Sequence, residues 1–455
     1  MKKIAFIPLS ILALHVGSLW AEKTLTNGDG FVGNIYLHGL FFHLWLFFGV
    51  LLLVLLFIKS TIPTLKNIGF TSFIFLIFWG FLELIAWGLI QTNILKTKPP
   101  SHGLFLSDAT LKNARRPFWG DYCTFSGKWR LPNDTLSFMR CDGKTKLYFK
   151  TNNYGCRDRQ RSVADTAKKG RIIWLGDSFV EGQMVNVEDR TSNRLEAYTG
   201  HEHLNFGING TATLEYYLRY KYQAKYFDHK AVIVSVLPAN DFGYYNHTDE
   251  EKENLISFPI YRPYTLSNNN TTVRYSLANI TQSYASATNY NHPQKQTIVR
   301  DSIFHNSLSF LQKTKILFST NSYLWAVVVA LQKSRNGSLP AFYEKFSNEG
   351  WNALRGNLGR LFVESKQKKM IVLIYPIHQD VVNYKTSGVN ELTPALEKFC
   401  KSYGVQTIDL LPVFASHPDP ASLYVPCDGH LNETGEEFVT NFLLKNEVYQ
   451  GLLRD

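Results

Sequence analysis

Short apolar runs, each ended by a glycine or proline, recur along the last two-thirds of the chain. They cover residues 172–175, 204–206, 231–237, 370–375 and 406–410. Runs of this length that stop at turn residues predict buried parallel strands. Helix-like spacing of apolar residues fills the intervals at 190–198, 213–226, 351–366, 392–403 and 434–445. In the last of these, Thr434 and Glu437 are spaced as a helix-capping box.

Strands that alternate with helices predict an α/β fold with a doubly wound, mainly parallel sheet in a flavodoxin-like three-layer arrangement. We place this domain at 168–455, with an insertion at about 241–340. Functional sites of such folds lie at the carboxyl ends of the strands. The insertion follows a strand end directly, so our hypothesis is that it caps the site. An ordinary surface excursion is the alternative.

The first hundred residues have a different pattern, with long apolar stretches. Residues 1–21 are typical of a signal peptide or a first transmembrane helix, and 38–58 and 69–91 are predicted transmembrane helices. Each of the latter has roughly 20 residues, enough to cross about 30 Å of hydrocarbon. Lysines precede the first stretch and lie between the other two. The positive-inside rule therefore places the lead-in segment 95–167 and everything after it outside the membrane.

Two ionisable residues interrupt the apolar stretches. His43 and Glu83 lie at comparable depth from the outer side and are able to pair. A polar patch for a lipid-linked substrate is one interpretation, and a bond that locks two helices together is the other.

The net charge and the cysteine spacing bear on which partners and metal or redox sites the protein could have. The net charge of +11 suits anionic lipid head groups or acidic glycans. No nucleic-acid-binding motif is present, so we predict no nucleic-acid partner. None of the five cysteines has C-x-x-C spacing, which argues against a zinc ribbon or thioredoxin-like site. Outside the cytoplasm, Cys123–Cys141 and Cys400–Cys427 are the candidate disulfides, and buried free thiols are the alternative.

Two short motifs have the residue types of nucleophilic catalysis. Gly176-Asp177-Ser178-Phe179 follows a predicted strand, where a sharp turn into a helix would expose the serine and aim a backbone N–H at developing negative charge. Cys427-Asp428-Gly429-His430 precedes the last helix, where Asp428 could orient His430 as the base that takes the serine proton. Each motif alone also occurs in ordinary turns.

Taken together and in this order, the motifs resemble the SGNH (GDSL-type) hydrolase family over about 152–455. The resemblance implies that Ser178 is the nucleophile, His430 the base and Asp428 its orienting partner. It also implies an oxyanion hole made by Ser178, Gly207 and Asn240. Pro238 departs from the family pattern, which often has glycine two residues before the Asn. The resemblance calls for no metal and no cofactor.

The function expected from this resemblance is that of a serine esterase. It would remove O-acyl groups, with O-acetyl favoured, from glycan of the cell envelope or from a lipid-linked glycan, outside a bacterial cytoplasmic membrane. An O-acyltransferase with the same triad and a multi-span acyl-donor partner is an alternative. A non-catalytic glycan-binding module and a phospholipase are the others.

Overall fold

The computed structural model of the chain forms two compact units, Met1–Pro117 with Ser309–Gly337 and Phe118–Leu308 with Ser338–Asp455. The structure describes residues 37–58, 61–92, 135–166, 170–242, 322–335, 341–365 and 368–454, with short pieces elsewhere. Nearly all of 1–21, and most of the expected insertion at 241–340, lie outside the described residues.

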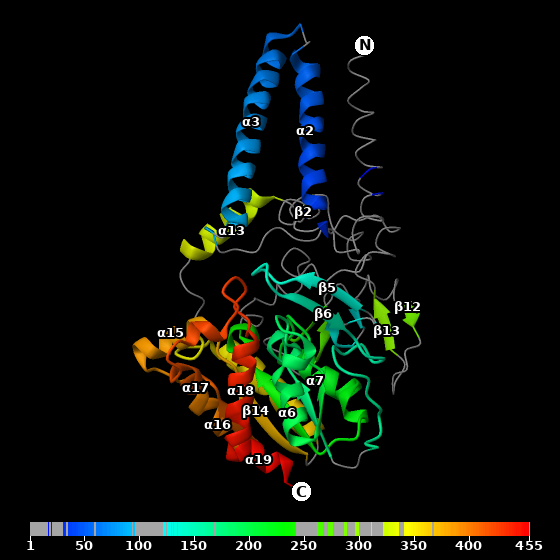
Figure 1. Cartoon of the computed structure of the whole chain (residues 1–455), viewed down its shortest axis with the longest axis vertical. Helices are drawn as coiled ribbons and strands as arrows, with labels where there is room; N and C mark the ends of the chain where they lie inside the picture. The colour runs from blue at the N-terminus through cyan, green and yellow to red at the C-terminus, as the bar shows by residue number, and fades with distance from the viewer. Residues whose placement is uncertain are drawn as a thin grey trace. The chain divides into compact units, whose positions relative to one another are not determined.

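A five-stranded sheet is the centre of the second unit (Figure 1). Its strand order is β15-β14-β9-β7-β8, and every neighbouring pair is parallel. The strands are β7 (Arg171–Leu175), β8 (Glu202–Asn205), β9 (Ala231–Val236), β14 (Lys369–Ile374) and β15 (Gln406–Asp409). The prediction of a parallel sheet in an α/β fold is confirmed. Because β8 and β9 lie on opposite sides of β7, the strand order reverses at the carboxyl end of β7.

Helices lie between these strands along the chain and follow the last of them. They are α5 (Ser178–Glu181), α6 (Thr191–Thr199), α7 (Thr213–Tyr222), α8 (Pro238–Asp241), α14 (Asn348–Glu364), α15 (His378–Ser387), α16 (Leu392–Lys401), α17 (Leu411–Ala415), α18 (Glu433–Lys445) and α19 (Glu447–Leu453). Helix α7 packs against α14, and α6 packs against α18. Right-handed crossovers place these two pairs on opposite faces of the sheet, which gives three layers.

The last long helix starts earlier than the sequence indicates. Asn432 caps α18, because its side-chain oxygen accepts a hydrogen bond from Gly435 N at 2.9 Å. The predicted capping box at Thr434 and Glu437 is therefore wrong. Asn, like Thr, is a good N-cap residue, so spacing alone did not identify which of them ends the preceding loop.

The lead-in segment contributes short antiparallel strands to the second unit. Strands β5 (Thr135–Met139) and β6 (Lys146–Lys150) form a hairpin. Strands β3 (Tyr122–Cys123) and β4 (Gly127–Lys128) join β12 (Ser286–Thr288) and β13 (Gln296–Val299) in a separate sheet. A further pair is formed by β10 (Pro263–Tyr264) and β11 (Arg274–Tyr275). Described pieces of 241–340 thus pair with one another and with β3.

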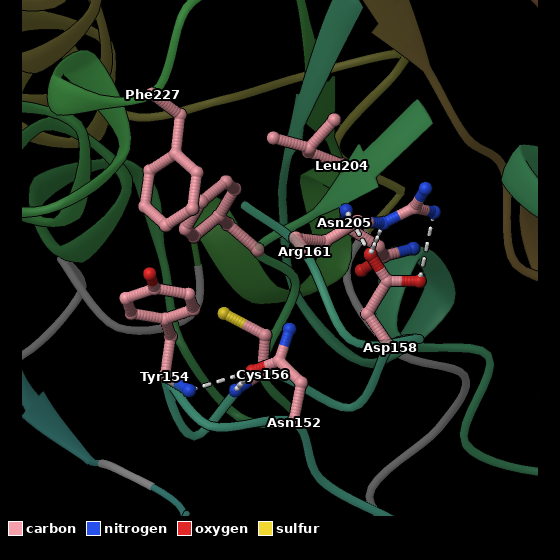
Figure 2. Close-up of a pocket in the computed structure, with 9 residues that line it drawn as sticks. Asn152, Tyr154, Cys156, Asp158, Arg161, Leu204, Asn205 and Phe227 are labelled. Carbon is pink, nitrogen blue, oxygen red and sulfur yellow. Dashed lines mark hydrogen bonds and ion pairs between the residues drawn. The ribbon is translucent and has the colours of Figure 1, made fainter. Parts of the chain in front are cut away.

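The stretch after the hairpin packs tightly onto the central sheet. Figure 2 shows that the side chains of Asn152, Tyr154, Cys156 and Asp158 face Leu204 and Phe227. Asp158 accepts hydrogen bonds from Arg161 Nε at 2.9 Å and from the backbone N of Asn205 at 3.3 Å. The lead-in stretch is therefore part of the α/β core and fixes the end of β8.

The described part of the first unit is mainly helical. It contains α2 (Leu37–Ile58), α3 (Pro63–Gln91) and α13 (Tyr323–Arg335), with a two-residue strand pair at β1 (Phe31–Val32) and β2 (Ile35–Tyr36). By length and composition, the stretch Lys66–Ile90 could cross a membrane, whereas the apolar stretch His43–Leu52 is shorter. The transmembrane helices predicted at 38–58 and 69–91 therefore stay a proposal.

Glu83 is a buried carboxylate within the apolar helix α3. Its Oε2 lies 3.1 Å from His43 Nε2 on α2, so the predicted pairing of these two residues is confirmed. The same carboxylate accepts hydrogen bonds from Ser322 Oγ and from the backbone N atoms of Tyr323 and Leu324, at 2.9 and 3.2 Å. Glu83 thus joins α2, α3 and the start of α13, as expected of a bond that locks helices together.

Candidate active site

Ser178 lies where the central strand β7 turns into α5. Gly176, two residues earlier, allows this turn, because an added Cβ would meet Val180 Cγ2 at 2.4 Å and Ser235 Cβ at 2.8 Å. Asp177 caps the helix, with its side chain accepting from Phe179 N at 2.9 Å. Ser178 is the first helical residue, so its own N–H is among those that an α-helix leaves unbonded.

His430 and Asp428 come from the loop before α18 and meet Ser178. His430 Nε2 lies 2.7 Å from Ser178 Oγ, and His430 Nδ1 is hydrogen-bonded to Asp428 Oδ1. The Asp428 side chain is fully buried and that of His430 is 19% exposed. The intervening Gly429 has φ of +88°, a backbone conformation that favours glycine and that brings the two side chains to the same side.

Gly207 lies after β8, beside α5. An added Cβ would meet the backbone N of Glu181 at 2.6 Å and Val180 Cγ1 at 2.7 Å, so only glycine allows this approach. Its N–H donates to Asn205 Oδ1 at 3.0 Å. The structure therefore places Gly207 against the serine helix, with the N–H expected at the oxyanion already hydrogen-bonded to a side chain.

Asn240 lies on α8, after β9. Pro238, the departure from the family pattern, is the first residue of that helix, a position where its fixed φ is favourable. The Asn240 side-chain amide donates to Asp177 Oδ2 at 2.5 Å. An amide nitrogen has two hydrogens, so one remains for another acceptor. Asn240 is thus next to the serine turn, bonded to the residue that precedes the serine.

Asp177 is fully buried, and burial raises its pKa to about 6. Hydrogen bonds from Phe179 N and Asn240 and the positive potential of His430 oppose this rise. Burial also raises the pKa of Asp241 well above its ordinary value, and the charge of Asp177 adds to that effect. Two buried carboxyl groups with displaced pKa values beside one serine are typical of a functional site.

Buried arginines brace the end of the serine helix. Arg157 donates to the carbonyl oxygens of Glu181, Gly182 and Val185 at 3.0, 2.5 and 2.6 Å. Arg130 binds the Glu181 carboxylate at 3.0 Å, and that carboxylate also accepts from Asn209 N at 2.8 Å. The catalytic motifs around Ser178 and His430 do not predict this network. The signal for it lies in the lead-in segment, at Arg157 in the sequence 152–158.

The disulfide of this unit joins Cys141 to Cys427, with Cα atoms 6.1 Å apart. The predicted pairs Cys123–Cys141 and Cys400–Cys427 are therefore wrong, and Cys156 and Cys400 are buried free thiols. The error has a physical reason. We paired cysteines that are close in sequence, whereas the fold brings together two that are 286 residues apart.

His203 also differs from the sequence-based interpretation. His201 and His203 have metal-like spacing but no acidic cluster beside them, which predicts surface residues, whereas His203 is fully buried. Its Nδ1 accepts a hydrogen bond from Trp174 Nε1 at 2.7 Å, and burial lowers its pKa to about 3. His203 is therefore a neutral core residue, because an indole partner on the adjacent strand satisfies it.

Comparison with known proteins finds a matching family model. The model of the GDSL-like lipase/acylhydrolase family matches residues 174–438. A solved structure assigned to the lipolytic G-D-S-L family, from Desulfitobacterium hafniense DCB-2, is 10% identical, covers 63% of this chain and 99% of its own, with a TM-score of 0.28. Another solved structure is 14% identical, with coverages of 63% and 98% and a TM-score of 0.29. No curated protein matches the sequence.

The matched span is more than half of the chain and includes the serine turn, Gly207, Asn240 and the histidine loop. Its description as a family of acylhydrolases supports ester hydrolysis. The chain therefore belongs to the GDSL-like lipase/acylhydrolase family.

Proposed function

We propose that this protein is a membrane-anchored serine esterase that removes O-acyl groups, chiefly O-acetyl, from envelope or lipid-linked glycan outside the cytoplasm. The observation that carries the proposal is the Ser178–His430–Asp428 arrangement, with 2.7 Å between Ser178 Oγ and His430 Nε2. A base at this distance can take the serine proton as the serine attacks.

The chemistry follows from that geometry. Ser178 Oγ bonds to the ester carbonyl carbon while its proton passes to His430 Nε2. The tetrahedral intermediate then expels the alcohol oxygen, which receives that proton. Water attacks the acyl-serine with His430 again as base, which releases the carboxylic acid and restores the serine. Asp428 holds His430 in the tautomer that accepts at Nε2.

The oxyanion would be stabilised by the N–H of Ser178 and the second amide hydrogen of Asn240. We give Gly207 N–H a lesser part, because it already donates to Asn205 Oδ1. Each such donor typically contributes about 10²–10³ to turnover. Gly207 also acts by allowing β8 to approach the serine helix.

Three observations support a membrane anchor with the α/β unit outside the cytoplasm. Disulfides persist in oxidising compartments, and Cys141–Cys427 lies in the α/β unit. The stretch Lys66–Ile90 has the length and composition of a membrane span. The lysines on its amino-terminal side favour a cytoplasmic position for that end.

A fluorophosphonate probe tests the nucleophile on the detergent-solubilised full chain. Covalent labelling in the wild type that disappears in Ser178→Ala is the expected result. Acetate release from an acetylated glycan, measured with and without an unacetylated acceptor, then separates hydrolysis from acyl transfer. A folded wild type that neither reacts with the probe nor releases acetate would favour the glycan-binding alternative.

A further inference from the structure

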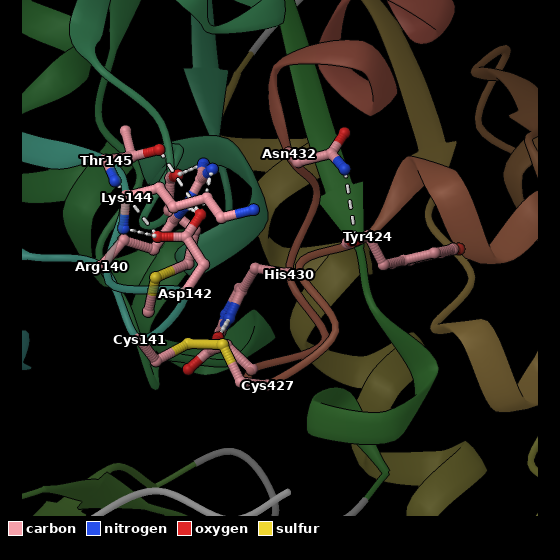
Figure 3. Close-up of a disulfide and its surroundings, with 11 residues drawn as sticks. Arg140, Cys141, Asp142, Lys144, Thr145, Tyr424, Cys427, His430 and Asn432 are labelled. Atoms are coloured by element: carbon pink, nitrogen blue, oxygen red, sulfur yellow. Dashed lines mark hydrogen bonds and ion pairs between the residues drawn. A yellow bond between two sulfur atoms is a disulfide. The ribbon is translucent and has the colours of Figure 1, made fainter. Parts of the chain in front are cut away.

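The turn of the β5–β6 hairpin contacts both ends of the loop that carries the histidine and its aspartate. Two neighbouring residues of this turn make the contacts. Cys141 forms the disulfide with Cys427, directly before Asp428 (Figure 3). Arg140 Nη1 binds the two Glu433 carboxylate oxygens at 2.8 and 2.9 Å, three residues after His430.

The same arginine also reaches the serine side of the site. Arg140 Nη1 donates to the carbonyl oxygen of Met184 at 3.1 Å, in the segment that follows the serine helix. Leu147 and Phe149 of strand β6 form a small apolar cluster with Met184 and Val425, and both disulfide cysteines pack against it. The hairpin therefore connects the segment after Ser178 to the loop of His430.

We propose that Arg140 and the Cys141–Cys427 disulfide are positioning residues that hold Asp428 and His430 against Ser178, so that cleaving the disulfide lowers turnover. This inference rests on the proposed esterase function. We define the clamp as Arg140, Cys141, Cys427 and Glu433.

The loop needs outside support because little of its own structure is regular. Between Val425 and Leu431 its backbone makes a few turn bonds, such as Asp428 N and Gly429 N to Val425 O at 3.0 and 2.8 Å. It contains a glycine at positive φ, whose conformational freedom is large in an unconstrained loop. Without the clamp, the loop would be held by these turn bonds, by the bond from Val425 N to His430 O at 2.8 Å and by the start of α18.

The charges of the clamp are retained although it is partly buried. Desolvation lowers the pKa of Arg140, but its bonds to Asp142 and Glu433 raise it by more, so the guanidinium stays protonated. Asp142 Oδ2 binds Arg140 Nε at 2.7 Å and fixes the orientation of the planar group. A planar donor held in this way can serve the carboxylate and the carbonyl at once, which an ammonium group cannot do equally well.

The test compares oxidised and reduced wild type with the variants Cys141→Ala/Cys427→Ala, Arg140→Gln and Arg140→Lys, all as the solubilised full chain. Dithiothreitol reduces the disulfide to two thiols and is itself oxidised to its cyclic disulfide. Both cysteines are partly exposed, so the reagent can reach them. Cys400→Ala, which removes a buried free thiol on α16, is the matched control.

We expect reduction and the double cysteine variant to lower kcat and the rate of fluorophosphonate labelling by about 10- to 100-fold, with little change in KM, since small displacements of a catalytic group cost this much. Arg140→Gln should behave similarly and Arg140→Lys should recover part of the loss. Dithiothreitol should have no further effect on the double variant, and Cys400→Ala should keep wild-type kcat and the same sensitivity to dithiothreitol.

Hydrogen exchange of the backbone amides 425–433 provides a readout that needs no activity. We expect exchange in this segment of the wild type to become faster on reduction and to return to its original rate on reoxidation. Because this measurement uses the folded wild type, it stays valid even if a variant folds poorly. Unchanged exchange together with full labelling of the reduced protein would overturn the clamp. A wild type that is never labelled, yet shows faster exchange on reduction, would instead count against the esterase function.

Discussion

The two sides of the active site are held in place in different ways. The serine side is built into the core, with β7 beneath it, Gly207 against its helix, and Arg157 and Arg130 bracing the end of that helix. The histidine side is a short loop whose ends are tied to a separate hairpin by a disulfide and an ion pair. The serine should therefore be sensitive to changes in the core, and the histidine to changes at the surface and in redox state.

The largest expected effect on turnover comes from removing the catalytic side chain of either side of the site. Ser178→Ala and His430→Ala should each lower kcat by on the order of 10⁴ or more, and the double variant should be no worse than either single one, because the two residues act as one unit. Steady-state hydrolysis of a nitrophenyl ester measures this. Losses that multiply in the double variant would show that the two sides work independently.

Asp428→Asn should have the next largest effect. The amide can hold His430 in place but favours the wrong tautomer, and a comparable change in a serine protease costs about 10⁴ in turnover. We expect a loss of about 10³–10⁴ in kcat with unchanged KM and unchanged melting temperature. A variant with near wild-type kcat would mean that another group orients His430.

Glu181→Gln should affect the serine side through stability. Glu181 is fully buried between Arg130 and Asn209 N, so neutralising it leaves buried arginines without their counter-charge, at a cost of about 3–5 kcal/mol. Denaturant unfolding of the α/β unit in the full chain, followed by circular dichroism, measures this loss. Asp189→Asn, on a partly exposed residue that pairs with Arg194, is the matched control and should cost far less.

The pH dependence of stability gives the same experiment a second readout. Burial would raise the pKa of Glu181, but Arg130 and Arg157 outweigh it and lower the pKa below its ordinary value. The unfolded chain therefore binds this proton more readily, so the contribution of Glu181 to stability is present above the ordinary glutamate pKa and is lost as pH falls below it. Glu181→Gln should lose this part of the acid dependence. A variant that retains it would show that other carboxylates are responsible.

The sequence predicts the strands and the order of the motifs well because both depend on local signals. Apolar runs that stop at Gly176, Gly207 or Pro238 specify where strands end, and strand ends of a parallel sheet lie on one edge. The clamp could not be predicted, because Arg140 and Glu433 are 293 residues apart and neither lies in a recognisable motif. Burial of His203 was missed for a similar reason, since its partner Trp174 belongs to another strand.

Asp177→Asn should have the smallest effect. It should show how ionisation of Asp177 changes stability and activity. Burial raises the pKa of Asp177 to about 6, so the folded protein holds a proton that the unfolded chain releases near its ordinary value of 3.8. The stabilisation that this proton provides is present below that ordinary value and is lost as pH rises to about 6.

In the ionised form the two carboxylate oxygens of Asp177 accept from Phe179 N and Asn240, so activity should rise over the same interval. An asparagine has one acceptor oxygen and can keep only one of these bonds, which should lower kcat by about 10-fold and remove the part of the pH–rate profile that belongs to Asp177. The profile of kcat/KM from pH 4 to 8 measures this, and a variant that retains the wild-type profile would show that Asp177 does not account for the titration.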